Sequence, residues 1–318
     1  MTAMRPKVAV IGAGNVGSAF AFSLMLSGLA REIVLIDLDR DKAAGECMDL
    51  NHGLSFAQPA RIYDAGYEGC AGSDLVVITA GASQKPGQTR IDLVEKNVGI
   101  FKEMIPQITR YAGDSVILVV TNPVDILTYV TLKVSGYASH RVLGSGTVLD
   151  TSRLRYLLSD HCNVDPRNVH AYIIGEHGDT ELPVWSNASI GGMHFEAYCT
   201  HCVQQRQCDM ERNREHIFEE VKNAAYKIIE DKGATYYAIA LALVRITEAL
   251  LRDENSVLPI STLITDYYDV NDVCLSIPSR VNKTGVERFL TLTLSEQEQD
   301  RFRHSAESLK QVLHRIGY

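Results

Sequence analysis

A glycine-rich turn near the amino terminus has the residues and the spacing of a phosphate-binding loop. Gly12, Gly14 and Gly17 form a G-x-G-x-x-G run that follows a predicted strand at 7–12 and opens a predicted helix near 15–28. Gly12 permits the tight turn, Gly14 lets the backbone approach a pyrophosphate, and Gly17 lets helix and strand pack closely. The amino end of the helix offers N–H groups and partial positive charge to the phosphates. This context predicts dinucleotide binding.

An acidic residue at the end of the next predicted strand selects between the two nicotinamide dinucleotides. Asp37 ends the predicted strand at 32–37, about twenty residues after Gly17, where a carboxylate binds both ribose hydroxyls. Its negative charge repels a 2′-phosphate, so the sequence favours NAD over NADP. Lys42 lies one turn into the following helix, where it either reaches the adenosine side of the site or is a solvated surface lysine.

Other polar side chains follow predicted strands, at the edge where the ligands of parallel sheets bind. Asn122 closes the apolar run VILVVT, and His177 lies in the loop GEHGD. Asp150 and Arg153 stand at i and i+3 at the start of a predicted helix, on one face. Each has an ordinary alternative, because a lone histidine is usually structural, an Asp–Arg pair on a helix is usually a surface ion pair, and Asn-Pro is usually a turn.

The segment 81–90 is a further candidate part of a site. It follows a predicted strand, contains two glycines and a proline, and ends at Arg90. We expect it to be long enough to act as a lid.

The alternation of apolar and amphipathic runs predicts the fold that must position these residues. Strands are expected at 7–12, 32–37, 74–80, 115–121 and 141–144, with helices near 15–28, 40–50, 91–112 and 124–135. Because the strands are almost continuous runs of Val, Ile and Leu, we expect an α/β fold with a Rossmann-type doubly wound parallel sheet, buried on both faces.

The second half of the chain has a different pattern. Strands are expected at 168–174, 256–263 and 272–285, with helices near 209–231, 235–252 and 295–316. The change falls near residue 145 without a flexible linker. We therefore predict a dinucleotide-binding domain at 1–145 and a tightly packed, mixed α+β catalytic and substrate domain at 146–318.

Composition excludes several other classes of protein. The 31 Lys+Arg and 39 Asp+Glu residues give a net charge of −8 without a basic run, which argues against nucleic acid and anionic membranes as partners. No apolar run approaches the roughly 18 residues of a membrane span, and no signal-peptide core is visible. Seven mostly scattered cysteines fit reduced thiols in the cytoplasm.

A cluster of cysteines and histidines at 194–208 leaves two alternatives. Cys199-x-x-Cys202 is either half of a zinc site or part of a variable surface segment. No second CxxC follows, so we expect no metal.

Five further segments carry a resemblance to a known family. They are GASQKPGQTR (81–90), VTNPVD (120–125), GSGTVLDTSRLR (144–155), IIGEHGDTELPVWS (173–186) and GATYYAIA (233–240). In these segments, and in this order, the chain resembles the L-lactate dehydrogenases of the lactate/malate dehydrogenase family.

The resemblance implies a catalytic role for the three strongest candidates. His177 would take the hydroxyl proton while hydride passes from C2 of the substrate to nicotinamide C4. Asp150 would hold the imidazole tautomer and stabilise the imidazolium. Arg153 would bind the substrate carboxylate with two parallel hydrogen bonds, which a lysine cannot imitate.

The resemblance also implies residues around the substrate and along the cofactor. Arg90 would polarise the substrate carbonyl, where negative charge develops on the oxygen, and Asn122 would donate a hydrogen bond to that oxygen. Thr235 would lie against the substrate. The cofactor-binding set would be Gly12, Gly14, Val16, Gly17, Asp37, Lys42, Tyr67, Gly81, Ala82, Val120, Thr121, Asn122 and Ser145.

Gln84 bears on the choice of substrate. Within the family, the residue at this lid position separates lactate from malate enzymes, and an arginine there would pair with the second carboxylate of oxaloacetate. Gln84 is neutral and would leave that charge without a partner. We therefore expect reversible reduction of pyruvate to L-lactate with NADH, the last step of fermentation. The alternatives are another NAD-dependent 2-hydroxy acid dehydrogenase, for malate or a longer chain, and a non-catalytic protein that retains the fold.

Two further residues match a regulatory pattern of the family. Arg155 lies about 200° around the helix from Arg153 and so points away from the substrate. In bacterial relatives activated by fructose 1,6-bisphosphate, the residues matching Arg155 and His170 bind the effector. The resemblance therefore implies an allosteric homotetramer with this effector as a partner.

Overall fold

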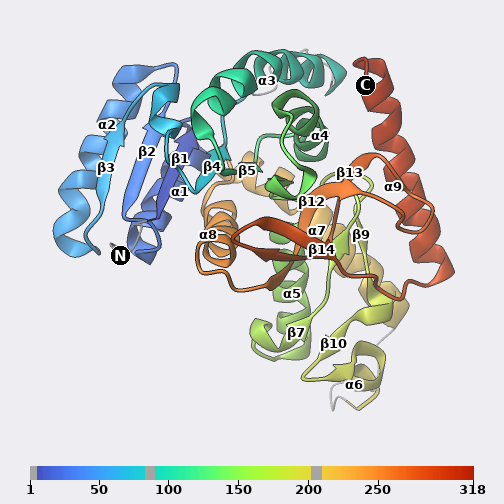
Figure 1. Ribbon diagram of the computed structural model, residues 1–318. Helices are drawn as coiled ribbons and strands as arrows, with labels where there is room; N and C mark the ends of the chain where they lie inside the picture. Colours follow the sequence, from blue (N-terminus) through green and yellow to red (C-terminus); the bar gives the residue numbers. More distant parts are fainter. Residues whose placement is uncertain (1–5, 83–89, 202–209) are drawn as a thin grey trace.

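A nine-stranded sheet runs through the computed structural model, which describes residues 6–82, 90–201 and 210–318 (Figure 1). The strand order is β14-β13-β12-β6-β5-β4-β1-β2-β3. The parallel strands are β1 (Lys7–Ile11), β2 (Glu32–Ile36), β3 (Arg61–Asp64), β4 (Leu75–Ile78), β5 (Val116–Val119) and β6 (Val142–Gly144). The order reverses between β1 and β4, which creates the crevice where doubly wound sheets bind their ligands.

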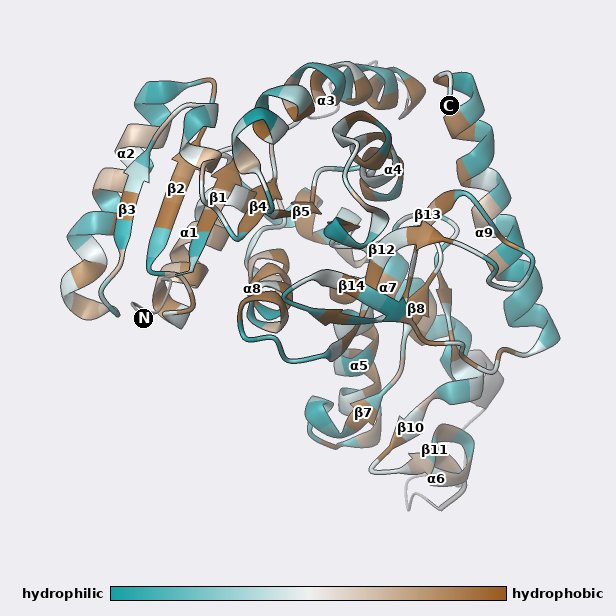
Figure 2. Ribbon diagram, viewed as in Figure 1, coloured by the Kyte–Doolittle hydropathy of each residue, from teal (hydrophilic) through white to brown (hydrophobic). Residues whose placement is uncertain are grey.

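Helices cover both faces of the parallel strands. They are α1 (Asn15–Ser27), α2 (Arg40–His52), α3 (Arg90–Ala112) and α4 (Val124–Ser135). Alternate residues of β1 enter different cores: Val8 and Val10 pack with α1 and α2, whereas Ala9 and Ile11 pack with α3 and α4. The apolar strands show as brown in Figure 2. The predicted α/β fold with a doubly wound parallel sheet is therefore confirmed.

The second half of the chain extends this sheet with antiparallel strands and adds two small sheets. Its strands are β7 (Val169–His170), β8 (Ile173–Ile174), β9 (Leu182–Pro183), β10 (Ser189–Ile190), β11 (Met193–His194), β12 (Ser256–Ile264), β13 (Val273–Asn282) and β14 (Gly285–Phe289). Its helices are α5 (Val148–Cys162), α6 (Phe195–His201), α7 (Met210–Lys232), α8 (Tyr237–Leu251) and α9 (Glu296–Arg315). Strand β12 joins the two halves, because Ser261 pairs with Gly144 of β6.

Short 3-10 helices complete the described elements. They are η1 (Gly53–Phe56), η2 (Tyr67–Cys70), η3 (Ser139–Arg141), η4 (Pro166–Asn168) and η5 (Trp185–Asn187). No helix in the described part of the chain is long and apolar enough to span a membrane.

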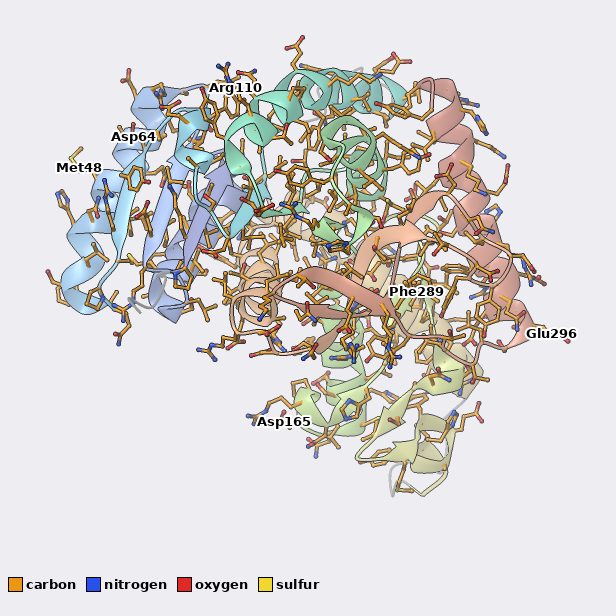
Figure 3. The ribbon with its side chains drawn as sticks, in the orientation of Figure 1. Met48, Asp64, Arg110, Asp165, Phe289 and Glu296 are labelled. Atoms are coloured by element: carbon orange, nitrogen blue, oxygen red, sulfur yellow. The ribbon has the colours of Figure 1, made fainter. Side chains whose placement is uncertain are left out.

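Three sequence predictions of strands were wrong in detail. Strand β3 was missed because it has four residues, of which only Ile62 is buried, and it lies at the sheet edge, where Figure 3 labels Asp64. The strand expected at 168–174 is two strands, because β7 pairs with β10 whereas β8 pairs with β9. The strand expected at 272–285 is a hairpin of β13 and β14 that turns before Gly285, whose φ is +105°.

Candidate active site

A chain of short polar contacts joins His177 to an aspartate and an arginine. Its Nδ1 lies 2.5 Å from Oδ2 of Asp150, and Oδ1 of the same carboxylate lies 2.7 Å from Nη1 of Arg153. Asp150 is 2% exposed, whereas 24% of the His177 side chain is exposed. Because Asp150 faces Nδ1, the Nε2 edge of the imidazole is left to exchange a proton with a ligand. The structure thus brings together three residues that the sequence singled out.

Two buried threonines, Thr147 at the N-cap of α5 and Thr151 in its first turns, set Asp150 beside the loop that carries His177. Thr147 Oγ1 donates to the carbonyl of Ile173 on β8 at 2.6 Å. The N–H of Ile173 in turn donates to Thr151 Oγ1 at 2.9 Å. The first turn of α5 is therefore fixed to the strand from which the histidine loop departs.

A second buried carboxylate, which the sequence motifs did not predict, holds the backbone of the histidine. Oδ2 of Asp125, in the first turn of α4, accepts a hydrogen bond from the backbone N–H of His177 at 2.7 Å. Its Oδ1 accepts from the hydroxyl of Ser261 on β12 at 2.6 Å, and the side chain is 2% exposed. The available signal was an acidic residue in the otherwise apolar start of the helix, VDILTYV. His177 is therefore held at its ring and at its backbone by different helices.

The electrostatics of the cluster favour an imidazolium. Burial alone would lower the pKa of His177, but the charge and hydrogen bond of Asp150, with Glu181 and Asp125 nearby, raise that pKa to about 9. Burial opposes ionisation of Asp150, yet the neighbouring His177 and Arg153 hold its pKa below the usual range. Burial raises the pKa of Asp125 to about 7, against the hydrogen bonds from Ser261 and the His177 backbone. This is the balance that a proton donor at neutral pH requires.

A groove of about 590 Å³ lies over the glycine turn at the carboxyl edge of the sheet. Seven of the residues predicted to bind the cofactor line it: Gly12, Gly14, Asp37, Lys42, Tyr67, Gly81 and Ala82. A Cβ at Gly14 would meet nothing within 4 Å, and no side chain caps the amino end of α1 there. The groove therefore offers open space and helix N–H groups where a pyrophosphate would bind.

The groove also contains residues and contacts that were not predicted from the sequence. Arg40, Lys96 and Thr79 line it as well. Asp37, beyond the role expected for it, accepts a hydrogen bond from the backbone N–H of Ala13 at 2.6 Å, which ties the end of β2 to the glycine turn. Because these contacts join residues far apart in sequence, no local pattern marks them.

The other residues predicted for the cofactor lie outside this lining. They are Val16, Gly17, Val120, Thr121, Asn122 and Ser145. Gly17 has the packing position expected, since a Cβ there would lie 1.9 Å from the carbonyl oxygen of Gly12. Buried Asn97 fixes two strand ends, because its amide accepts from the N–H of Ala82 at 2.7 Å and donates to the carbonyl of Asn122 at 3.0 Å. No pattern in the sequence marks this asparagine.

Several predicted residues lie at or beyond the edges of the described segments. Gln84 is outside them, as are Cys202 and the end of the Cys/His cluster. Arg90 is the first residue of α3, but its side chain is not among those described. Thr235 is half-buried in the loop between α7 and α8. Cys199 is buried.

Arg155 and His170 lie near each other, away from the catalytic cluster. Nε of Arg155 donates to the carbonyl of Ala171 at 3.1 Å, and its guanidinium lies 5.2 Å from the ring centroid of Tyr172. His170, next to Ala171, is exposed. Within the described residues, no carboxylate forms an ion pair with Arg155.

Family models cover both halves of the chain. The model described as lactate/malate dehydrogenase, NAD binding domain, matches residues 6–144, and lactate/malate dehydrogenase, alpha/beta C-terminal domain, matches residues 147–316. The chain belongs to the lactate/malate dehydrogenase family. The resemblance seen in the sequence is thereby confirmed, and the protein is an NAD-dependent oxidoreductase.

Relatives of this dehydrogenase are similar over nearly its whole length. An L-lactate dehydrogenase of Acetivibrio thermocellus is 56% identical over 96% of both chains, and one of Priestia megaterium is 54% identical over 96% of this chain and 95% of the relative. The crystal structure of a lactate dehydrogenase from a Medee basin deep-sea metagenome library superposes with a TM-score of 0.95, at 44% identity, covering 99% of this chain and all of that one. The minor L-lactate dehydrogenase of Enterococcus mundtii gives 0.94 at 39% identity over 98% of both chains.

Proposed function

We propose that this dehydrogenase reduces pyruvate to L-lactate with NADH and catalyses the reverse oxidation, as the names of its relatives indicate. The observation that carries this proposal is the contact chain Arg153–Asp150–His177, with 2.7 Å and 2.5 Å between its polar atoms. It places a proton donor beside a cation that suits a 2-oxo acid. The bound dinucleotide supplies the hydride.

Each member of the chain has a distinct task in pyruvate reduction. Protonated His177 donates its Nε2 proton to the carbonyl oxygen, so that the imidazole becomes neutral as the alcohol forms. Asp150 accepts at Nδ1 throughout and stabilises the charged form of the ring. Arg153 binds the substrate carboxylate with the part of its guanidinium that Asp150 does not occupy. Arg90 and Asn122 would donate hydrogen bonds to the carbonyl oxygen that receives the proton, and Thr235 would lie against the substrate.

The neutral Gln84 supports pyruvate over oxaloacetate as the substrate. A steady-state assay of both 2-oxo acids with NADH tests this, with His177→Gln as the catalytic control. We expect a higher kcat/KM for pyruvate and a loss of at least about 10²-fold in the variant, because acid–base catalysis is typically worth 10²–10⁴-fold. A preference for oxaloacetate would overturn the proposal, and so would more than about a tenth of the activity in the variant.

We also propose that the enzyme is a homotetramer activated by fructose 1,6-bisphosphate. The support is the hydrogen bond from Arg155 to the carbonyl of Ala171, the residue that follows exposed His170. Two copies related by a two-fold axis would direct four cationic groups at two phosphates. The effector would remove the repulsion between these groups and favour the active assembly.

A pyruvate titration with and without the effector tests this regulation in wild type and Arg155→Gln. Coupling of this kind typically changes affinity by about 5–150-fold, so the wild-type KM should fall by a factor in that range and the variant KM should not. Identical wild-type curves would refute activation, and undiminished activation of Arg155→Gln would exclude this site. Sedimentation that shows only monomer, with or without effector, would refute the tetramer.

We also propose where the two domains meet and where in the cell the protein works. We place the boundary between the dinucleotide-binding and the catalytic domain at residue 145, where β6 ends and the chain passes to α5. We also propose a cytoplasmic location, since Cys47, Cys70 and Cys274 are buried free thiols.

A further inference from the structure

A third carboxyl group lies against the catalytic pair. One carboxyl oxygen of Glu181, one of Asp150 and a ring nitrogen of His177 all lie within 4.8 Å of one another. Glu181 is 7% exposed. The site described so far gives this buried acid no task, although it is close enough to the imidazole for its charge to shift the pKa of the ring.

The fold places Glu181 there through a hairpin. Strands β8 and β9 are antiparallel neighbours, and their pairing of Ile174 with Leu182 closes the loop that carries both His177 and Glu181. The backbone N–H of Glu181 donates to the carbonyl of Gly178 at 3.3 Å within this loop. Glu181 is therefore held on the same hairpin as the histidine.

The nearby Glu176 shows what a purely structural acid looks like in this loop. It is buried, and its carboxylate accepts from the hydroxyl of Thr180 at 2.5 Å, while its backbone N–H donates to Ser305 of α9 at 2.8 Å. Among the described residues, none donates a hydrogen bond to the carboxyl group of Glu181. Its interactions there are with charges rather than with hydrogen-bond donors.

The charges around Glu181 come from four elements. Asp150 and Arg153 belong to α5 and His177 to the shared loop, while Lys222 faces it from α7. Glu181 also lines a cavity of about 550 Å³. The other charged or titratable residues in the lining of this cavity are Asp179 of the loop, Arg214, Glu215 and Glu219 of α7, and Arg301 and His304 of α9. The cavity side is solvated and carries both signs of charge, so the buried cluster dominates.

A charged Glu181 depends on a charged His177. Burial and the charge of Asp150 raise the pKa of Glu181 well above its usual value, while His177, Arg153 and Lys222 lower it. A carboxylate at this site is therefore costly next to a neutral imidazole and favourable next to an imidazolium. Each group in its charged form therefore stabilises the charged form of the other.

We propose that Glu181 is a positioning residue that keeps His177 protonated for pyruvate reduction, through its negative charge and without touching the substrate. The proposal rests on the proposed function, because the state of His177 is read from that reaction. An opposite charge at about 4–6 Å typically shifts a pKa by one to three units. Removing the carboxylate should therefore let His177 lose its proton at lower pH.

The test is a pair of pH profiles of kcat/KM, for pyruvate at saturating NADH and for lactate at saturating NAD. Glu181→Gln removes the charge and keeps the size of the side chain. Glu219→Gln is the matched control, because it removes the same charge from the exposed wall of the same cavity. We expect the alkaline fall of pyruvate reduction and the acidic fall of lactate oxidation to move down by about one pH unit or more in Glu181→Gln alone. High salt should leave that shift in place, because the cluster is buried.

Several results would overturn the proposal. A folded Glu181→Gln enzyme with an unmoved profile would show that Glu181 carries no charge while His177 titrates. An equal loss of rate at every pH would instead assign Glu181 a direct catalytic or purely structural task. If Glu181→Gln does not fold, Glu181→Ser must shift the profile in the same direction. A wild type inactive towards pyruvate would refute the proposed function as well, whereas an active wild type with an unmoved variant would refute this proposal alone.

Discussion

Replacing Gly17 with alanine should damage the fold, whereas replacing Gly14 should damage only cofactor binding. A Cβ at Gly17 would lie 1.9 Å from the carbonyl oxygen of Gly12 and 2.8 Å from Oγ1 of Thr79. The oxygen cannot yield easily, because it already accepts from the Thr79 hydroxyl at 2.9 Å and belongs to a residue with φ of +103°. Helix α1 would have to move away from β1 by more than an ångström.

The cost of this movement is set by two opposing effects. Overpacking of this kind typically costs about 1–3 kcal/mol or more, and alanine in a helix interior returns about 1 kcal/mol relative to glycine. We therefore expect Gly17→Ala to lose about 1–2 kcal/mol of unfolding free energy, which lowers Tm by a few degrees in a chain of this size. A Cβ at Gly14 would meet nothing within 4 Å, and the φ of −77° there suits any residue. Gly14→Ala should therefore cost under about 1 kcal/mol.

Thermal unfolding without cofactor, followed by circular dichroism, separates the two variants. A fluorescence titration with NADH then measures cofactor binding. The methyl group added in Gly14→Ala would lie in the groove and should weaken NADH binding by at least about tenfold. A Gly17→Ala protein as stable as Gly14→Ala would refute the packing argument. Unchanged NADH affinity in Gly14→Ala would refute the position assigned to the pyrophosphate.

Three further predictions concern the reaction and its specificity. The pKa of His177 is raised to about 9, and pyruvate reduction needs the imidazolium, so the rate of reduction should fall as pH rises through that value. Lactate oxidation needs the neutral imidazole, so its rate should fall as pH drops below the same value. Rates that change in the opposite directions would contradict the role assigned to His177. Asp150→Asn should lower that pKa and slow reduction at pH 8 by at least about tenfold, and a stopped-flow rate equal to that of wild type would count against the contact chain. Gln84→Arg should raise kcat/KM for oxaloacetate relative to pyruvate, since it supplies the missing cation, and an unchanged ratio would show that residue 84 does not face the substrate.

The sequence was most informative where a local pattern decides the structure. The glycine run, the apolar strands and the long helices predict β1, β2, β4 to β6 and α1 to α4 near their observed bounds. Such segments carry their own periodicity, and burial on both faces leaves them few alternatives. Strand β3, the division of 168–174 into β7 and β8, and the short strands β9 to β11 were not predicted, because their pairing depends on neighbours that the local sequence does not reveal.

The same distinction explains which parts of the site were predicted. His177, Asp150 and Arg153 lie in motifs that mark them directly. Asp125 lies in the motif VTNPVD and Glu181 shares the motif of His177, yet nothing in the residues shows that one binds the histidine backbone and the other lies beside its ring. Those relations exist only after α4 and the β8–β9 hairpin have packed together.

The order of the strands explains why two carboxylates reach the histidine together. Strands β5 and β6 are neighbours, and each is followed by a helix that starts at the same edge of the sheet. Asp125 lies in the first turn of α4 and Asp150 in the first turn of α5, where the partial positive charge of each helix favours an ionised acid. One acid holds the backbone of His177 and the other its ring, so neither contact can shift without disturbing the helix behind it. The parallel sheet therefore does more than bind the dinucleotide, since it also fixes the orientation of the residue that moves the proton.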